Sequence, residues 1–240
     1  DASGLTGATF TSNYRDSTGQ IILSWADAPS APTLGTITPG NAQLSAAFTP
    51  GSDGGSAITS YKYSTDNGAT YRTRQTGTTA SPIVITTESA DGTTPLANGT
   101  SYTVLIKAVN AVGDGAASNS VAATPSTTPS APTALVATGG DAQVSVAFTA
   151  GATGGSAITS YKYSTDNGAT YLTRQTGTTA SPLLITTLSS DGTTPLSNGV
   201  TYQIKLKAVN ANGDGTASAA VSGTPVAPSF PKNLLLLGVG

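Results

Sequence analysis

Apolar and polar residues alternate along most of this chain with the two-residue period of β-strands. The clearest segment is 101–109, where Tyr102, Val104, Ile106 and Ala108 fall on one face and the residues between them fall on the other. Segment 201–209 repeats the pattern, and no stretch carries the period of an amphipathic helix. The alternation therefore predicts an all-β protein whose strands are each buried on one face.

The same pattern recurs after 100 residues. The string GGSAITSYKYSTDNGATY stands at Gly54 and again at Gly154, and Pro-rich segments separate the copies. Seven strands are expected in the first copy, at 34–37, 43–48, 58–64, 71–75, 83–87, 101–109 and 116–123. Seven short strands in about 95 residues are typical of a β-sandwich. We therefore expect two such units, at 30–126 and 127–226.

Composition excludes several classes of function. Ten basic and twelve acidic residues leave a net charge of −2, which argues against nucleic-acid binding and gives no support for docking to anionic membranes. The longest apolar run, 234–237, is too short for a membrane span. The chain has no Cys and no His, so disulfides, thiolate or imidazole metal sites and Ser-His triads are ruled out. We expect no cofactor; an all-oxygen calcium site in the Asp/Gly loops stays open.

One repeated motif has a chemical precedent. The string YSTDNGATY, at Tyr63 and Tyr163, matches the spacing of the aspartate box of sialidases. The same residues also favour a hairpin turn. Asp66 and Asp166 can accept backbone N–H groups two residues on, and Gly68 and Gly168 can take a positive φ. A retaining glycosidase needs two carboxyl groups about 5 Å apart, yet the only Glu, Glu88, is Leu188 in the second copy. We interpret the box as a structural turn and expect no catalytic residue and no enzyme.

The strings LANGTSYTVLIKAVNAVGDGAAS at Leu96 and LSNGVTYQIKLKAVNANGDGTAS at Leu196 carry a further resemblance. They resemble the sixth-strand signature of the fibronectin type III family, and PSAPT and AITSYKYS match that family as well. The resemblance implies two tandem immunoglobulin-like, seven-stranded sandwiches in which Tyr102 and Tyr202 are corner tyrosines. Phe48 and Phe148 stand where the family usually has a core Trp.

Two groups of residues suggest a binding role. Tyr61, Tyr71, Arg72 and Arg74 are spaced to form a small polar-aromatic patch of the kind that stacks on sugars or on a partner, although ordinary exposed strand residues are the commoner explanation of such a pattern. The ends belong to neither unit. Residues 1–29 are expected to contain a β-hairpin, and 227–240 resemble a linker and a lone first strand of an incomplete third unit. The ends carry the candidate assembly residues Ile21, Ile22, Leu23, Trp25, Leu234, Leu235, Leu236 and Leu237.

Together these features predict a non-enzymatic structural or adhesive protein at an extracellular, cell or virion surface. Its modules would act as spacers, and its ends would pair between copies into a head-to-tail homo-oligomer, a filament or a larger surface assembly. The alternative is a spacer or glycan-binding module of a secreted polysaccharide-degrading enzyme. Because the chain begins at Asp1 and shows no signal peptide, we expect it to be processed or an excerpt. In the second case the ends would pair with other parts of the same polypeptide.

Overall fold

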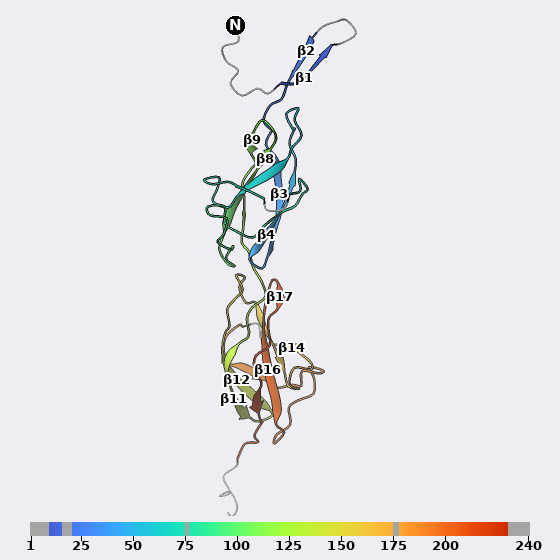
Figure 1. Cartoon of the computed structure of the whole chain (residues 1–240). Helices are drawn as coiled ribbons and strands as arrows, with labels where there is room; N and C mark the ends of the chain where they lie inside the picture. The colour runs from blue at the N-terminus through green and yellow to red at the C-terminus, as the bar shows by residue number, and fades with distance from the viewer. Residues whose placement is uncertain (1–9, 16–20, 75–76, 175–177, 230–240) are drawn as a thin grey trace, which may run out of the picture. The chain divides into compact units, whose positions relative to one another are not determined.

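The structure is a computed structural model that describes residues 10–15, 21–74, 77–174 and 178–229. Every element in these ranges is a strand, and the chain divides into two compact units between Thr127 and Thr128 (Figure 1). The first element is an antiparallel hairpin of β1 (Phe10–Arg15) and β2 (Ile21–Trp25). The hairpin joins unit 1 through Ala26, which is buried, and through Asp27, whose N–H donates to the Gly54 carbonyl at 2.8 Å.

Unit 1 is a sandwich of two antiparallel sheets. One sheet has the order β3-β4-β7; the other has the order β10-β8-β5-β6, with β9 also pairing with β8. The strands are β3 (Thr33–Gly40), β4 (Gln43–Thr49), β5 (Ser60–Ser64), β6 (Arg72–Thr73), β7 (Ile83–Ile85), β8 (Tyr102–Val109), β9 (Asp114–Ala117) and β10 (Val121–Ala123).

Unit 2 repeats this topology. Its sheets have the orders β11-β12-β15 and β14-β13-β16-β17, with β18 also pairing with β16. The strands are β11 (Thr133–Gly140), β12 (Gln143–Thr149), β13 (Ser160–Ser164), β14 (Leu172–Thr173), β15 (Leu183–Ile185), β16 (Tyr202–Asn210), β17 (Gly213–Asp214) and β18 (Val221–Gly223). The prediction of two tandem, all-β, immunoglobulin-like sandwiches is confirmed. Of the extra terminal strands, the N-terminal hairpin is present, and the lone C-terminal strand expected within 227–240 lies almost wholly outside the described residues.

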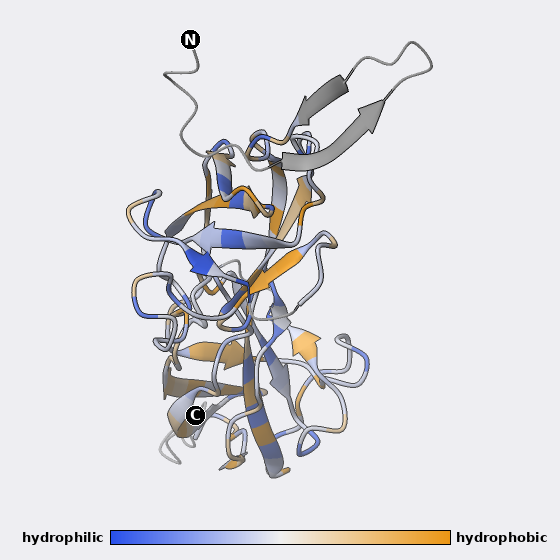
Figure 2. Cartoon of the chain, turned by 45° about the horizontal axis from the view of Figure 1, so that its top comes forward, coloured by the Kyte–Doolittle hydropathy of each residue, from blue (hydrophilic) through white to orange (hydrophobic). Residues whose placement is uncertain are grey.

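Each unit has its own core, made by the alternation that the sequence displays. Along β8 every second residue is buried, and Val104, Ile106 and Ala108 are completely buried. The partner sheet contributes Leu44, Ala46 and Ile83, which are also completely inaccessible to solvent. Unit 2 has an equivalent cluster, and Figure 2 shows the resulting alternation of hydrophobic and hydrophilic residues along its strands. Burying a large aliphatic side chain contributes about 1.5–3 kcal/mol, so each core stabilises its own unit.

The last strand of each sandwich is interrupted, in contrast to the continuous strand expected at 116–123. Buried Ser118 lies between β9 and β10, and its hydroxyl accepts the N–H of Ile106 at 3.0 Å. Ser218 does the same for Leu206 in unit 2. A side-chain oxygen thus replaces a backbone carbonyl in the ladder, which breaks the regular strand into two pieces.

No helix in the described part of the chain is long and apolar enough to cross a membrane.

Candidate functional site

The box motif forms the connection between β5 and β6 in unit 1 and between β13 and β14 in unit 2. Asn67 and Gly68 have φ values of 59° and 88°, and Asn167 and Gly168 have values of 61° and 95°. These left-handed conformations reverse the chain, and Asn and Gly are the residues that adopt them at least cost.

The carboxylate of the box is fully engaged within its own loop. Asp66 Oδ1 accepts from the Ser64 hydroxyl at 2.7 Å and from the Thr70 N–H at 3.0 Å, and Oδ2 accepts from the Thr70 hydroxyl at 2.5 Å. Asp166 accepts the same three bonds at 2.6, 3.0 and 2.6 Å. The carboxylate therefore holds the two ends of the loop together.

One detail differs from the expected turn. The N–H two residues after Asp66, that of Gly68, donates to the Ser64 hydroxyl at 2.8 Å and not to the carboxylate. Ser64 ends β5 with its hydroxyl buried at the base of the loop, so it is the acceptor for that N–H. Asp66 instead reaches the N–H four residues on, which closes a wider loop than an Asx-turn.

Two further contacts fix the loop to the body of the sandwich. The Asn67 N–H donates to the Thr103 carbonyl of β8 at 3.1 Å. Buried Ser89 accepts the Thr65 N–H at 3.0 Å, and its hydroxyl lies 2.9 Å from that of Thr70. Unit 2 has the same bonds through Gln203 and Ser189. The loop is thus anchored at both sides.

The electrostatics of the box agree with a turn. Burial raises the pKa of Asp166, but hydrogen bonds from Ser164 and Thr170 outweigh burial and lower this pKa to about 2. The pKa of Asp66 is lowered by the same balance. A carboxylate that is ionised at neutral pH and has both oxygens occupied is a poor general acid or base.

The one glutamate of the chain is engaged with a tyrosine of its own unit. Glu88 Oε1 accepts from the Tyr102 hydroxyl at 3.1 Å, and its counterpart in unit 2 is Leu188. Across the described ranges, no three acidic side chains converge in a way that could hold a metal ion.

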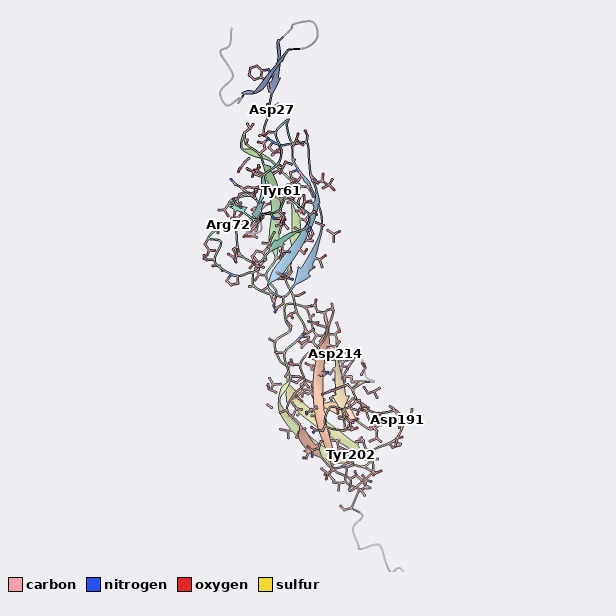
Figure 3. The ribbon with its side chains drawn as sticks, turned by 45° about the vertical axis from the view of Figure 1, so that its right-hand side comes forward. Asp27, Tyr61, Arg72, Asp191, Tyr202 and Asp214 are labelled. Carbon is pink, nitrogen blue, oxygen red and sulfur yellow. The ribbon has the colours of Figure 1, made fainter. Side chains whose placement is uncertain are left out.

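The proposed patch of Arg and Tyr side chains does not form. Tyr61 is 1% exposed and packs on Phe48 with ring centroids 4.5 Å apart, inside unit 1 (Figure 3). Arg74 is also buried, and its guanidinium donates to the carbonyls of Ala80 at 2.7 Å and Pro82 at 3.2 Å. Tyr61 is buried because it lies on the same strand face as Tyr63, the face that covers the core.

Arg72 also has a packing role. It lies against Gly92, where a Cβ would collide with the guanidinium. Leu172 lies against Gly192 in the same way in unit 2. Since an apolar residue replaces it in the repeat, the charge of Arg72 is not required for this contact.

The outer face of the larger sheet carries a set of lysines that sequence reasoning missed. In unit 1, Lys62 pairs across the strands with Lys107 and forms an ion pair with Asp114 at 2.8 Å. Lys107 Nζ lies 4.2 Å from the centre of the Tyr71 ring. Five of the six lysines of the chain belong to this face of the two units: Lys62, Lys107, Lys162, Lys205 and Lys207. The two-residue spacing of Lys205 and Lys207 on a strand is the signal that could have revealed it.

Unit 2 repeats these contacts and adds a charge. Lys162 pairs with Asp214 at 2.8 Å, and Lys207 lies 4.2 Å from the Tyr171 ring centre. Lys205 stands where unit 1 has Leu105. A lysine ammonium therefore lies over one face of each of these two Tyr rings.

The four aromatic residues predicted for the core lie as follows. Phe48 and Phe148 are 7% and 9% exposed on β4 and β12. The Tyr102 hydroxyl accepts the Ala97 N–H at 3.0 Å, and the Tyr202 hydroxyl accepts the Ser197 N–H at 3.0 Å. Tyr102 is buried and Tyr202 is half-buried.

Only part of the predicted assembly set can be placed. Ile21, Ile22 and Leu23 belong to β2, and the orientation of their side chains is not described. Trp25 ends β2 with 45% of its surface exposed. Leu234, Leu235, Leu236 and Leu237 lie outside the described residues.

No protein-family model matches the chain. No curated protein matches it either. Among solved structures, the FN1–FN3 domains of chicken CNTN1 are similar, with 20% sequence identity and a TM-score of 0.44. The match covers 86% of this chain and 71% of that one. The chain itself is built from two antiparallel β-sandwiches in tandem.

Proposed function

We propose that this chain is a non-enzymatic structural or adhesive protein of a cell or virion surface, in which the tandem sandwiches are spacers and the terminal segments mediate self-assembly. The observation that supports this most is the repeated engagement of the box carboxylates. Asp66 and Asp166 each bind only groups of their own loop. The one motif with a catalytic precedent therefore serves to hold a turn.

A spacer role is supported by the self-sufficiency of each unit. Each sandwich encloses a separate hydrophobic cluster. The chain has no Cys, so no disulfide contributes to either unit. Units that fold on their own cores can be repeated along a chain without a ligand or partner to stabilise them, which is what a spacer requires.

Self-assembly is supported by the composition of the terminal segments. A two-stranded hairpin is marginally stable in water, and β1-β2 ends in the exposed Trp25. The sequence 233–239 is almost wholly apolar. Strand addition would satisfy backbone groups of these segments and cover their apolar side chains. Because such a contact joins different surfaces of two copies, it gives a filament or a closed ring.

The test is the assembly state of the full chain compared with a variant lacking residues 230–240. Electron microscopy and sedimentation should show polymers for the full chain. The shortened chain should show only single molecules while its circular dichroism remains that of folded β-sheet. Polymers that persist in the shortened chain, or a full chain that stays monomeric at high concentration, would overturn the proposal.

The glycan-binding alternative has less support. Tyr61 and Arg74 are buried, and lysines cover the rings of Tyr71 and Tyr171. A glycan array probed with the full chain is the direct measurement, and we expect no specific signal on it.

A further inference from the structure

The first strands of the two units differ in how they cover the core. In β3, Leu34 and Ile37 are 3% and 8% exposed. In β11, Ala134 is exposed with φ of 53°, and Val136 is 60% exposed. No residue of β11 is fully buried, and only Leu135 and Ala137 reach the core in part. The first residues of β11 therefore leave the core of unit 2 less covered than β3 leaves the core of unit 1.

Unit 2 also lacks a pair of side-chain hydrogen bonds that unit 1 has, which we call the clamp. In unit 1, Asn119 Oδ1 accepts the Leu34 N–H at 2.9 Å, and its Nδ2 donates to the Leu34 carbonyl at 3.0 Å. One amide thus satisfies both backbone groups of Leu34 and ties β3 to the segment that enters β10. Unit 2 has Ala219 at this position, and a methyl group can make neither bond.

Unit 2 has a cleft where the clamp would be. It is open to solvent, has a volume of about 310 Å³ and lies between the beginning of β11 and the segment entering β18. The side chains that line it are mostly small and apolar, and they include Ala131, Ala134, Leu135, Ala219, Ala220 and Val221. A cleft with small apolar walls along a strand edge has room for the large apolar side chains of an added strand.

We propose that this cleft receives residues 233–239 of a second copy of the chain. The segment PSFPKNLLLLGVG from Pro228 aligns with PSAPTALVATGG from Pro129, which runs into β11. The segment thus resembles a first strand, but it carries leucines where β11 continues with Val, Ala and Thr. The leucine side chains of this segment are large enough to fill the space that the alanines lining the cleft leave open. The inference rests on the proposed self-assembly and names the surface that accepts the terminal strand.

The exit of the chain favours a second copy over the same copy. Val226 donates to the carbonyl of Gly140 at 2.9 Å, so the chain leaves unit 2 beside the last residue of β11. The cleft lies at Thr133, the first residue of that strand. Proline stands at every third position, 225, 228 and 231, and such a segment favours extended backbone over the reversal that a return to the cleft would need.

The test uses a fluorescein-labelled peptide of residues 229–240 and the full chain at low concentration. The full chain should bind the peptide and raise its fluorescence anisotropy, and excess peptide should dissociate the polymers. The variant Ala220→Lys places a charge in the cleft wall and should bind at least about tenfold more weakly. Ser120→Lys is the matched control in unit 1; both positions are exposed, so neither lysine should prevent folding, and the control should bind as the unchanged chain does.

Equal binding by Ala220→Lys and the unchanged chain would overturn the inference, as would a peptide that does not bind at all. A second variant guards against a nonspecific effect of the lysine. Ala134→Leu combined with Ala219→Asn rebuilds the residues of the unit 1 clamp and should also weaken peptide binding. Loss of 230–240 could abolish polymers while Ala220→Lys leaves both polymers and peptide binding intact. That result would support self-assembly and refute this cleft as the acceptor site.

Discussion

The backbone N–H of Thr170 donates across 3.0 Å to Oδ1 of Asp166, and Thr70 makes the same 3.0 Å bond to Asp66 in the first unit. The two residues are four positions apart and stand at opposite ends of the loop that they close. A motif known from an enzyme family is here a device for connecting two strands. Its repetition shows that the loop geometry is a property of the local sequence.

Replacing Asp166 with Ala should destabilise unit 2 by about 1 kcal/mol, as the loss of capping-type bonds from a side chain to the backbone does. Urea unfolding of the full chain measures the change. Asp214→Ala is the control, since it removes only a surface ion pair worth about 0.2–1 kcal/mol. A cost for Asp166→Ala no larger than that of the control would contradict the structural role of the box.

The low pKa of Asp166, about 2, gives the stability of unit 2 a pH dependence of known sign. An unfolded Asp titrates near pH 3.9. The contribution of the folded carboxylate is therefore fully present above about pH 4 and is lost as the pH falls toward 2. Asp191, on an exposed loop (Figure 3), has its pKa lowered to about 2 by bonds from the Thr194 hydroxyl and the N–H groups of Thr194 and Thr193 and acts in the same direction.

The check is acid unfolding followed by circular dichroism for the unchanged chain and for Asp166→Asn, which cannot ionise. The variant should be less stable at pH 7 and should lose less stability between about pH 4 and pH 2. Parallel stability curves for the two proteins across this interval would show that Asp166 does not contribute to the acid response.

Ala142 sits in the turn between β11 and β12 with φ of 51°, a conformation that disfavours any residue with a Cβ. Ala142→Gly should therefore stabilise unit 2, by up to about 1 kcal/mol. Ala147→Gly, in the middle of β12, should destabilise unit 2 by about 0.5–1 kcal/mol, because the backbone of a strand does not require a positive φ and glycine only adds freedom to the unfolded chain. Thermal unfolding distinguishes the two, and a loss of stability in both variants would contradict the argument.

The sandwich could be predicted because its signal is local and repeated. The alternation along 101–109 predicted which side chains of β8 enter the core, and the string around Tyr102 predicted the fold class. Arg74 and Tyr61 were misplaced as a surface patch for different reasons. Tyr61 follows the alternation of β5 and was simply assigned to the wrong face. Arg74 is buried by carbonyls six and eight residues later, in a segment without periodicity.

The features that distinguish the two units were harder to predict. The contact of Asn119 with Leu34 spans 85 residues. The sequence alone therefore does not show which contact is lost where unit 2 has Ala219 in place of Asn119. Its consequence appears only when the two strands are placed side by side. The lysine face was missed for a related reason, because Lys62 and Lys107 become neighbours only through the pairing of β5 with β8.

The corner tyrosines allow a further test that uses the differences between the units. In both units the Tyr hydroxyl accepts a backbone N–H of the preceding turn at 3.0 Å, but only Tyr102 also donates to Glu88. Tyr202→Phe and Tyr102→Phe should each cost about 1 kcal/mol, the usual contribution of one such hydrogen bond.

Glu88→Leu, which copies the residue of unit 2, should change stability by less than about 0.5 kcal/mol. The reason is that Leu188 packs against the core of unit 2 in the equivalent position, so new apolar contact offsets the lost hydrogen bond. Denaturant unfolding of the three variants is the measurement. If Glu88→Leu costs more than Tyr102→Phe, the Tyr102 hydroxyl stabilises unit 1 through the carboxylate and not through the turn, and the shared role of the two tyrosines is refuted.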